Sequence, residues 1–326
     1  MSTHGMIFEQ PQLFPNCHAS TIAHLGGGRL MAAWFGGSRE KHADVGIWFA
    51  VGQVGQWDPP RLLVKIGPVA HWNPVLFAAP DGRVHLFFKV GATIHGWRSF
   101  TMSSPDGGQT WTYPVEFCAQ DRIARGPVKN KPIVLSDGAW LAPASHEWSL
   151  GDRKFWDAFT DRSDDGGRTW LASPFVPIDH DTFPGVGVIQ PTLWESSPGN
   201  VHMLLRTKNG KVARSDSTNG GRSWSPATLL EMDHNNSGLD LTRLADGTLV
   251  LVHNPVVGKV RTPLSISVST DNGLSWRRAL DLETQPGEYS YPGIIAMDHQ
   301  TVAICYTWQR TAVAYWVGTG AELAGS

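Results

Sequence analysis

Ser163-Asp164-Asp165-Gly166-Gly167-Arg168-Thr169-Trp170 is the stretch of sequence that decides the fold. It follows the pattern Ser-x-Asp-x-Gly-x-Thr/Ser-Trp, and related stretches begin at Ser104, Ser217 and Ser269, the second of these with Asn219 in place of the Asp. The tryptophans that end the four stretches fall at 111, 170, 224 and 276, so the pattern recurs every 52 to 59 residues. A repeat of this length indicates one supersecondary unit used several times along the chain.

The residue types in the repeated stretch are those of a tight turn. Asp and Ser side chains hydrogen-bond nearby backbone N–H groups, and Gly adopts positive φ without steric cost. The Trp that follows is a large apolar anchor for the turn. We therefore expect these four stretches to hold the fold together and not to form the active site.

Each repeat also contains short apolar runs separated by Gly-containing turns, as in residues 73–77 and 84–88 on either side of Asp81-Gly82. Runs rich in Val, Leu and aromatic residues between such turns are typical of hairpin strands, and four antiparallel strands per repeat make a propeller blade. Two units without an intact repeated turn, at residues 18–57 and 291–318, bring the number of blades to six. The sequence predicts an all-β, six-bladed β-propeller with four-stranded antiparallel blades, with seven blades as the alternative.

The last unit lacks a fourth strand. We expect Met6-Ile7-Phe8-Glu9-Gln10 to supply it, because pairing the two ends of the chain closes the ring and removes its exposed edges. The whole chain, residues 1–326, is then a single propeller domain.

Composition excludes several classes of function. A formal net charge of −2 with no long run of one sign argues against a nucleic-acid groove or a polybasic membrane patch. The three cysteines are far apart, so no disulfide framework or zinc spacing is visible, and no other metal or cofactor is predicted. The N-terminal residues show no signal peptide and no apolar run long enough for a membrane span, so a cytoplasmic protein is the default expectation. The sequence does not predict an oligomeric state.

The candidate site follows from the geometry of a blade. The start of the first strand and the end of the second strand lie on one face of the disc, and the first strand lies nearest the axis. Polar or ionisable residues occupy nearly all of these places: His18, His71, Asn73, Lys131, Gln190, Asn236 and Tyr291 at the starts of first strands, and Glu40, Asp44, Lys89, His146, Arg206, Asn254 and Arg310 at or near the ends of second strands. Titratable groups that converge in a concavity are the usual mark of a ligand site.

Several of these residues also have a purely structural explanation. Asn73 and Lys131 precede prolines, which restrict the backbone of the residue before them. A buried Arg206 needs an anionic partner, and either a protein carboxylate or a ligand can supply it. Glu40 and Asp44, in a Gly-rich loop, are either catalytic or solvated charges.

The chain resembles the sialidase superfamily, in its Asp-box repeat branch, over nearly its whole length. Four segments carry the resemblance: Phe35-Gly36-Gly37 with Glu40 and Asp44 is similar to the loop of the sialidase acid/base Asp, Arg206 in Leu204-Leu205-Arg206-Thr207 to the second of three carboxylate-binding arginines, Asn236-Ser237-Gly238 to the strand near the sialidase Glu, and Glu288-Tyr289-Ser290-Tyr291 to the segment of the nucleophilic Tyr.

The departures from the sialidase pattern are equally informative. The family usually opens with Phe-Arg-Ile-Pro, which holds the first arginine, but here the stretch is Phe14-Pro15-Asn16-Cys17-His18. Arg310 is the best candidate for the third arginine, and the histidine at 71 is not part of the sialidase pattern. These features resemble a sialidase-like branch that includes lyases cleaving rhamnose from glucuronate.

The resemblance implies an enzyme that cleaves a terminal bond in an acidic oligosaccharide, and the surplus of histidines favours β-elimination at a uronate. Elimination needs a cation for the carboxylate, a base and an acid, and His and Tyr suit proton transfer near neutral pH. We expect His18, His71, Tyr291, Glu40 and Asp44 to be catalytic, and Arg206, Arg310, Lys131, Asn73, His146 and Asn236 to bind substrate. An exo-sialidase and a non-catalytic glycan-binding propeller are the alternatives.

Overall fold

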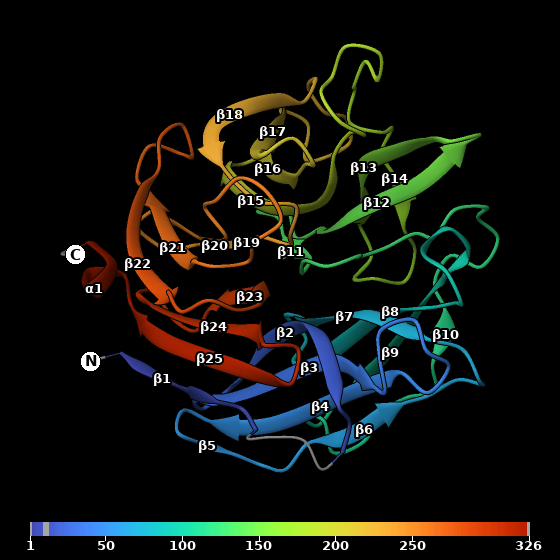
Figure 1. Ribbon diagram of the computed structural model, residues 1–326, viewed down its shortest axis with the longest axis vertical. Helices are drawn as coiled ribbons and strands as arrows, with labels where there is room; N and C mark the ends of the chain where they lie inside the picture. Colours follow the sequence, from blue (N-terminus) through green and yellow to red (C-terminus); the bar gives the residue numbers. More distant parts are fainter. Residues whose placement is uncertain (1, 9–12, 325–326) are drawn as a thin grey trace.

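The computed structural model describes residues 2–8 and 13–324. Within them, six antiparallel sheets are arranged around an axis, and Figure 1 looks down that axis onto the ring. The prediction of a six-bladed propeller is confirmed. In the described part of the chain no helix has the length and apolarity that a membrane crossing would require.

In each of the first three sheets, the strands are given in chain order, from the strand nearest the axis to the outermost strand. The strands of the first are β2 (Asn16–Gly26), β3 (Arg29–Gly37), β4 (Gly46–Gln53) and β5 (Gln56–Trp57), with β6 (Arg61–Val64) also paired to β4. Those of the second are β7 (His71–Ala78), β8 (Val84–Val90), β9 (Arg98–Ser104) and β10 (Val115–Glu116), with the 3-10 turn η1 (Ile94–Gly96) before β9. Those of the third are β11 (Ile133–Val134), β12 (Trp140–Leu150), β13 (Arg153–Ser163) and β14 (Leu171–Ala172).

The remaining sheets complete the ring. The strands of the fourth are β15 (Ile189–Ser197), β16 (Asn200–Arg206), β17 (Lys211–Ser217) and β18 (Thr228–Asp233). Those of the fifth are β19 (Asp240–Arg243), β20 (Leu249–His253), β21 (Leu264–Ser269) and β22 (Arg277–Glu283). Those of the sixth are β23 (Tyr289–Ala296), β24 (Thr301–Trp308), β25 (Ala312–Thr319) and β1 (Thr3–Met6), and the short helix α1 (Gly320–Ala324) follows β25.

The sixth sheet joins the two ends of the chain. β1 pairs with β25 in antiparallel register, with Thr3 opposite Val317, and Figure 1 shows the N- and C-termini side by side at this sheet. The closing strand is therefore Thr3–Met6, a few residues earlier than predicted. Residues 9 and 10 of the predicted strand lie outside the described residues.

The four repeated turns, which we call the Asp boxes, are built as their residue types predict. In the second sheet, Asp106 Oδ1 accepts from the backbone N–H groups of Gln109 and Thr110 at 3.0 and 2.9 Å, and its Oδ2 accepts from the Thr110 hydroxyl at 2.6 Å. These hydrogen bonds hold the pKa of the Asp106 carboxyl down at about 2. Asp165 and Asp271 repeat the arrangement, and their pKa values are lowered to about 2 in the same way.

Each Asp box packs on the preceding sheet. Gly221, for example, has φ +78, and a Cβ atom there would lie only 2.5 Å from Leu141 Cδ2 in the third sheet. Likewise, Asn272 in the fifth sheet accepts from Trp194 Nε1 in the fourth at 2.7 Å. We call the face of the disc that holds the starts of the first strands the mouth. Because the strands alternate in direction, the Asp boxes lie on the opposite face. The boxes therefore join neighbouring blades and contribute nothing to the mouth.

Candidate active site at the mouth of the propeller

The innermost strands of four sheets share a β-bulge near their start. The pairing register shifts between His18 and Thr21, Trp72 and Val75, Ile189 and Thr192, and Ser290 and Gly293. A non-glycine residue with left-handed φ lies at each bulge: Ala19, Asn73, Gln190 and Tyr291. Such a conformation costs about 1–2 kcal/mol, and a bulge redirects a side chain. Strain of this kind gathers at functional sites, and here it aims Gln190 and Tyr291 toward the mouth.

Arg206, the last residue of β16, is the centre of the site. Its Nη1 donates to the Tyr291 hydroxyl at 2.7 Å and to Gln190 Oε1 at 3.0 Å. Its Nε and Nη2 donate to Asn236 Oδ1 at 2.9 and 2.7 Å. The guanidinium also stacks 5.3 Å from the centre of the Trp156 ring. Every protein partner of Arg206 is neutral, and no carboxylate of the described residues is within ion-pair distance of it.

Two more arginines, Arg261 and Arg310, lie near Tyr291. The guanidinium carbon of Arg261 is 5.6 Å from the Tyr291 ring centre, close to the 5.7 Å of Arg206. Arg261 Nη1 donates to Glu288 Oε1 at 2.7 Å, and Arg310 Nε donates to the same oxygen at 2.6 Å. Arg310 Nη1 then donates to Glu40 Oε2 at 2.5 Å. The guanidinium groups of Arg206 and Arg261 are thus at similar distances from the tyrosine ring, and Glu288 and Glu40 both bond Arg310.

His18 lies against the same tyrosine. The two ring centres are 4.2 Å apart, and Nδ1 of His18 is 3.0 Å from the Thr307 hydroxyl. Burial lowers the pKa of His18 well below its usual value, and the positive charges of Arg310, Arg261, Arg206 and Lys129 lower it further. The imidazole is therefore neutral near pH 7. It does not add a positive charge to the site, and its Nε2 accepts a long hydrogen bond of 3.4 Å from Arg261 Nη1, which a proton from a ligand would have to replace.

Lys129 holds the backbone next to Tyr291. Its amino group donates to the carbonyl of Pro292, the residue that follows the strained Tyr291, and burial lowers its pKa to about 8. Gly238 fits between the two side chains, since a Cβ atom there would be 2.9 Å from Lys129 Cε and 3.3 Å from Tyr291 Cγ. Lys129 thus pins the backbone that positions the phenol.

The structure brings His18, Glu40, Arg206, Asn236, Tyr291 and Arg310 together, as the sequence predicts, but places other predicted residues differently. His71 is fully buried, its Nε2 accepts from the Ile66 N–H at 2.9 Å, and its Nδ1 bonds the Val69 carbonyl at 3.1 Å. Burial lowers the pKa of His71 to about 4. Both ring nitrogens are used by the backbone, so the expected exchange of a proton with substrate has no free nitrogen here.

Lys131 is also committed to the protein. Its amino group bonds both carboxylate oxygens of Asp240 at 3.1 Å and the Leu241 carbonyl at 2.8 Å. It borders a hollow shared with Ser136, Glu195 and Arg243, which lie toward the Asp-box face. The expected contact with substrate is therefore not available in this arrangement.

Three more predicted residues lie at the edge of the site or outside it. Asp44 accepts from the Ser38 N–H at 2.7 Å and from the Ser38 hydroxyl at 2.9 Å, and these bonds lower its pKa despite the opposing effect of desolvation. Asn73 is buried at its bulge. His146 lines a separate hollow with Trp148, Phe175 and His180.

Arg261 and Glu147 were not among the residues that the sequence pattern predicted for the site. Arg261 lies in the loop between β20 and β21, where no strand end marks it, and only the folded chain brings it to Tyr291. Glu147 follows His146 directly, and successive residues of a strand point to opposite faces. The end of β12 therefore presents Glu147, and not His146, on the side of Trp156 and Arg206.

The excess of positive charge decides what the mouth can do. Three arginines face two glutamates, and the guanidinium of Arg206 has no anionic partner among the described residues. Arginine forks next to a phenol suit the carboxylate of a small acidic ligand. No group of three or more His, Cys, Asp or Glu side chains that could hold a metal ion occurs in residues 2–8 and 13–324.

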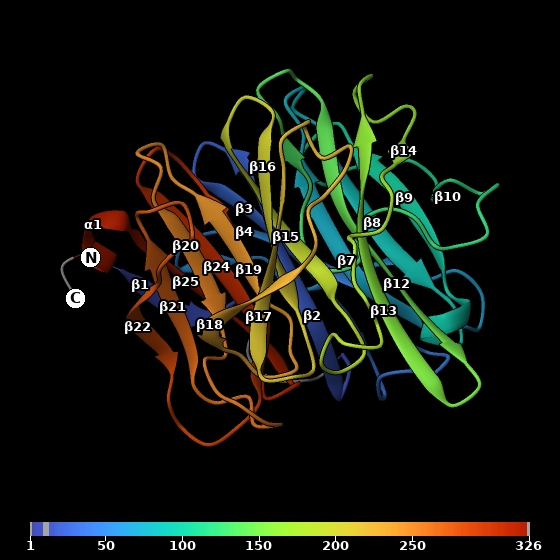
Figure 2. The same ribbon diagram turned by 90° about the horizontal axis from the view of Figure 1, so that it is seen from above.

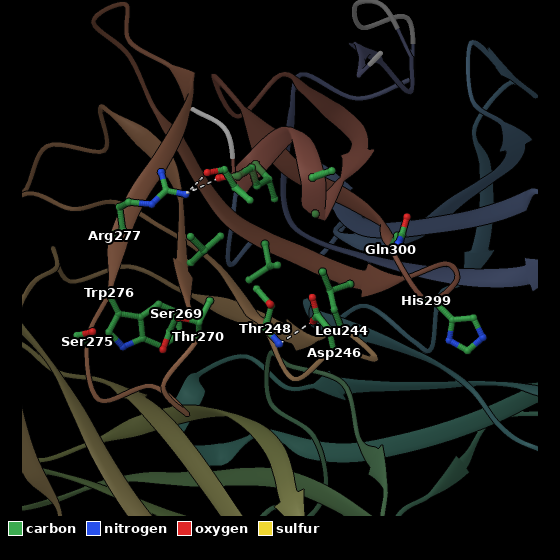
Figure 3. Close-up of a pocket in the computed structure, with 16 residues that line it drawn as sticks. Leu244, Asp246, Thr248, Ser269, Thr270, Ser275, Trp276, Arg277, His299 and Gln300 are labelled. Carbon is green, nitrogen blue, oxygen red and sulfur yellow. Dashed lines mark hydrogen bonds between the residues drawn. The ribbon is translucent and has the colours of Figure 1, made fainter.

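The Asp-box face holds a different kind of cavity. A pocket of about 570 Å³ lies between the fifth and sixth sheets, and Figure 3 shows it lined by Asp246, Thr248, Trp276, Arg277, His299 and Gln300. The sixth sheet has no Asp box to pack on the fifth. Helix α1 takes that place, with Leu323 buried against Leu244, Val250 and Val268. The pocket is the space that the helix leaves unfilled.

Comparison with known proteins agrees with the fold. The family model for the BNR repeat-like domain matches residues 28–304. The chain therefore belongs to the BNR repeat-like family. It is a sialidase-superfamily propeller, as the resemblance implied. That the chain belongs to the branch that contains the lyases stays a prediction.

Curated relatives of this BNR repeat-like chain include two bacterial sialidases. One, from Bacteroides fragilis, is 21% identical over an alignment 310 positions long that covers 82% of this chain and 54% of the relative. The other, from Micromonospora viridifaciens, is 28% identical over an alignment 222 positions long that covers 63% of this chain and 32% of the relative. The chain thus spans about half of one relative and a third of the other.

Solved structures show the same propeller. The Hadza microbial sialidase Hz136 matches 98% of this chain and 68% of its own, with a TM-score of 0.80 and 16% identity. A Dyadobacter fermentans protein of unknown function matches 97% of both chains, with a TM-score of 0.79 and 16% identity. Trypanosoma rangeli sialidase in complex with sialic acid matches 99% of this chain and 59% of its own, with a TM-score of 0.74 and 13% identity. At these identities the likeness concerns the fold.

Proposed function

We propose that the protein is a glycosidase that releases a terminal carboxylated sugar, of the sialic acid type, from a glycan. The observation that carries the proposal is Arg206, a buried arginine at the mouth whose hydrogen bonds all go to neutral groups, Tyr291 among them. The carboxylate of a sugar acid supplies the missing negative charge. The sialidase relatives support this choice over elimination at a uronate.

The chemistry divides among the residues around that carboxylate. Arg206 and Arg261, whose guanidinium carbons lie 5.7 and 5.6 Å from the Tyr291 ring centre, bind it and bring the anomeric carbon to the Tyr291 hydroxyl. The phenol oxygen, which accepts a hydrogen bond from Arg206, then faces the positive charge that develops as the glycosidic bond breaks. A glycosidase also needs a carboxylic acid for the leaving oxygen.

One observation favours a second candidate, the lyase that cleaves rhamnosyl-glucuronate bonds. In the described part of the chain no carboxylate hydrogen-bonds the Tyr291 hydroxyl, whereas the neutral imidazole of His18 packs against the Tyr291 ring. A neutral imidazole beside a phenol provides a base and an acid for elimination.

Product analysis separates the two candidates. The protein is incubated with a fluorogenic sialoside, with sialyl oligosaccharides and with a rhamnosyl-glucuronate oligosaccharide. We expect release of free sialic acid, a rate lowered about 10³-fold by Tyr291→Phe, and no ultraviolet absorbance from an unsaturated uronate. An unsaturated product from the uronate substrate establishes the lyase. Tight binding of glycan without turnover of any substrate shows a binding protein.

A further inference from the structure

The end of the long β12–β13 hairpin brings one carboxyl group next to the arginine site. Glu147 on β12 is the register partner of Trp156 on β13. The ring of Trp156 lies 5.3 Å from the guanidinium carbon of Arg206 and 4.5 Å from the amino group of Lys208. Figure 2 shows this hairpin reaching past its neighbouring strands at the edge of the disc. Glu147 thus belongs to the wall of the mouth.

The other carboxyl groups of the mouth accept hydrogen bonds from arginines or from Ser38. Glu288 accepts from Arg261 and Arg310, and Glu40 accepts from Arg310. Asp44 accepts from Ser38, which lowers its pKa. Glu288 and Glu40 are therefore bound to the arginines of the mouth, and Asp44 is bound to Ser38 within its own loop.

Glu147 has the opposite environment. It is partly buried and forms no ion pair with a described residue. Burial raises the pKa of its carboxyl group, and the effect persists against Arg206, the Trp156 side chain, Lys208 and His95, which all act to lower it. His95 Nδ1 also lies 3.0 Å from the Glu147 backbone carbonyl, and this contact connects η1 to the β12–β13 hairpin.

We propose that Glu147 is the general acid of the site, the group that protonates the leaving oxygen of a sialic-acid-type glycoside; this role rests on the proposed function. As the glycosidic C–O bond breaks, its electron pair goes to the leaving oxygen, and that oxygen takes the proton of the Glu147 carboxyl. The carboxylate that remains accepts a proton from the water whose oxygen bonds to the anomeric carbon. Glu147 is then protonated again, and the net reaction is hydrolysis.

The test compares two leaving groups in Glu147→Gln. The leaving group of an aryl sialoside is an acidic phenol, which can depart without being protonated. The leaving group of a sialyl oligosaccharide is a sugar hydroxyl, which must be protonated because a sugar alkoxide is a poor leaving group. We expect kcat for the oligosaccharide to fall about 10²- to 10³-fold and kcat for the aryl sialoside to fall less than about tenfold. In the wild type, kcat/KM for the oligosaccharide should decline as pH rises through the pKa of Glu147, and this alkaline limb should vanish in the variant.

Glu231→Gln on β18 is the matched control, because this side chain is 98% exposed and its ion pair with Lys211 is on the protein surface. This variant should have the wild-type kcat for both substrates. Equal losses on both substrates in Glu147→Gln, or no loss on either, overturn the role of Glu147 while leaving the glycosidase intact. If the wild type hydrolyses no sialoside, the proposed function itself fails, and the role of Glu147 fails with it.

Discussion

Two arginines of the fourth sheet, one at each face of the disc, make an instructive pair. Arg206 and Arg214 are 8% and 7% exposed, and each stacks 5.3 Å from the centre of a tryptophan ring, Trp156 and Trp194 respectively. Arg214, on the Asp-box side, donates to the Asp216 carboxylate at 2.9 Å. Arg206, at the mouth, has only neutral partners among residues 2–8 and 13–324.

The difference between the two arginines separates structure from function. The buried charge of Arg214 is balanced by a protein carboxylate. Arg214 also joins the fourth sheet to the fifth, because its Nη1 donates to the Asn272 carbonyl at 2.8 Å. A buried guanidinium without a carboxylate keeps its charge for a ligand. The same contrast holds for the two faces, since the Asp boxes repeat from blade to blade and the mouth residues do not.

Arg206→Ala is the strongest test of this contrast. We expect kcat/KM for the acidic glycan to fall about 10³-fold, because the substrate carboxylate loses its central partner, with little change in the unfolding midpoint. Steady-state kinetics and denaturant unfolding of the same preparation provide the two measurements. An active Arg206→Ala enzyme would falsify the proposal that this arginine binds the substrate.

Arg214→Ala should behave in the opposite way. It removes one of the two side chains that bond the Asp216 carboxylate, the other being His202 at 2.6 Å, and it opens space beside Trp194, so we expect the free energy of unfolding to fall by about 2–3 kcal/mol. Activity per folded molecule should match the wild type. A loss of kcat without a loss of stability would show that the two faces are coupled and would end the simple division between them.

Leu323→Ala tests how the blade interface without an Asp box is held. Leu323 is 1% exposed against the core of the fifth sheet, so truncation should lower the free energy of unfolding by about 2 kcal/mol, at the lower end for a buried leucine because the adjoining pocket is already open. Urea unfolding measures the change, and kcat should stay unaltered. An unchanged midpoint would mean that α1 does not stabilise this interface.

The Asp boxes should give the smallest effect, and it depends on pH. The folded pKa values of Asp106, Asp165 and Asp271 are about 2, below the usual 3.8, so their hydrogen bonds stabilise the fold above about pH 4 and this stabilisation is lost as the pH falls toward 2. Asp165→Asn, which copies Asn219, should change the melting temperature little at pH 7 and weaken its fall in acid. A variant with an unaltered acid profile would exclude this role.

The fold could be predicted because its signal is local and repeated. An Asp box needs only eight consecutive residues, such as Ser163 to Trp170, to specify its own hydrogen bonds. Four copies then give the blade length and number without knowledge of any long-range contact. The closing strand was placed a few residues late because its partner, β25, is distant in sequence.

The site could be predicted only in part, because its contacts are long-range. Strand-end reasoning located Arg206 and Tyr291, which are close to the ends of regular elements. It could not locate Arg261, which a loop carries to Tyr291, and it chose His146 over Glu147 because the facing of β12 depends on its register with β13. It proposed His71 for catalysis, but the backbone of residues 66–69 occupies both nitrogens of that ring.

The pairing of β1 with β25 imposes a delay on folding. Thr3 is made 314 residues before its partner Val317, so the ring cannot close until the ribosome has added all of the residues between them. At typical elongation rates of about 5–20 residues per second, this takes on the order of 15 to 65 s. During that time the first strand has no mate and can pair with other chains, which makes the nascent protein a candidate for chaperone binding.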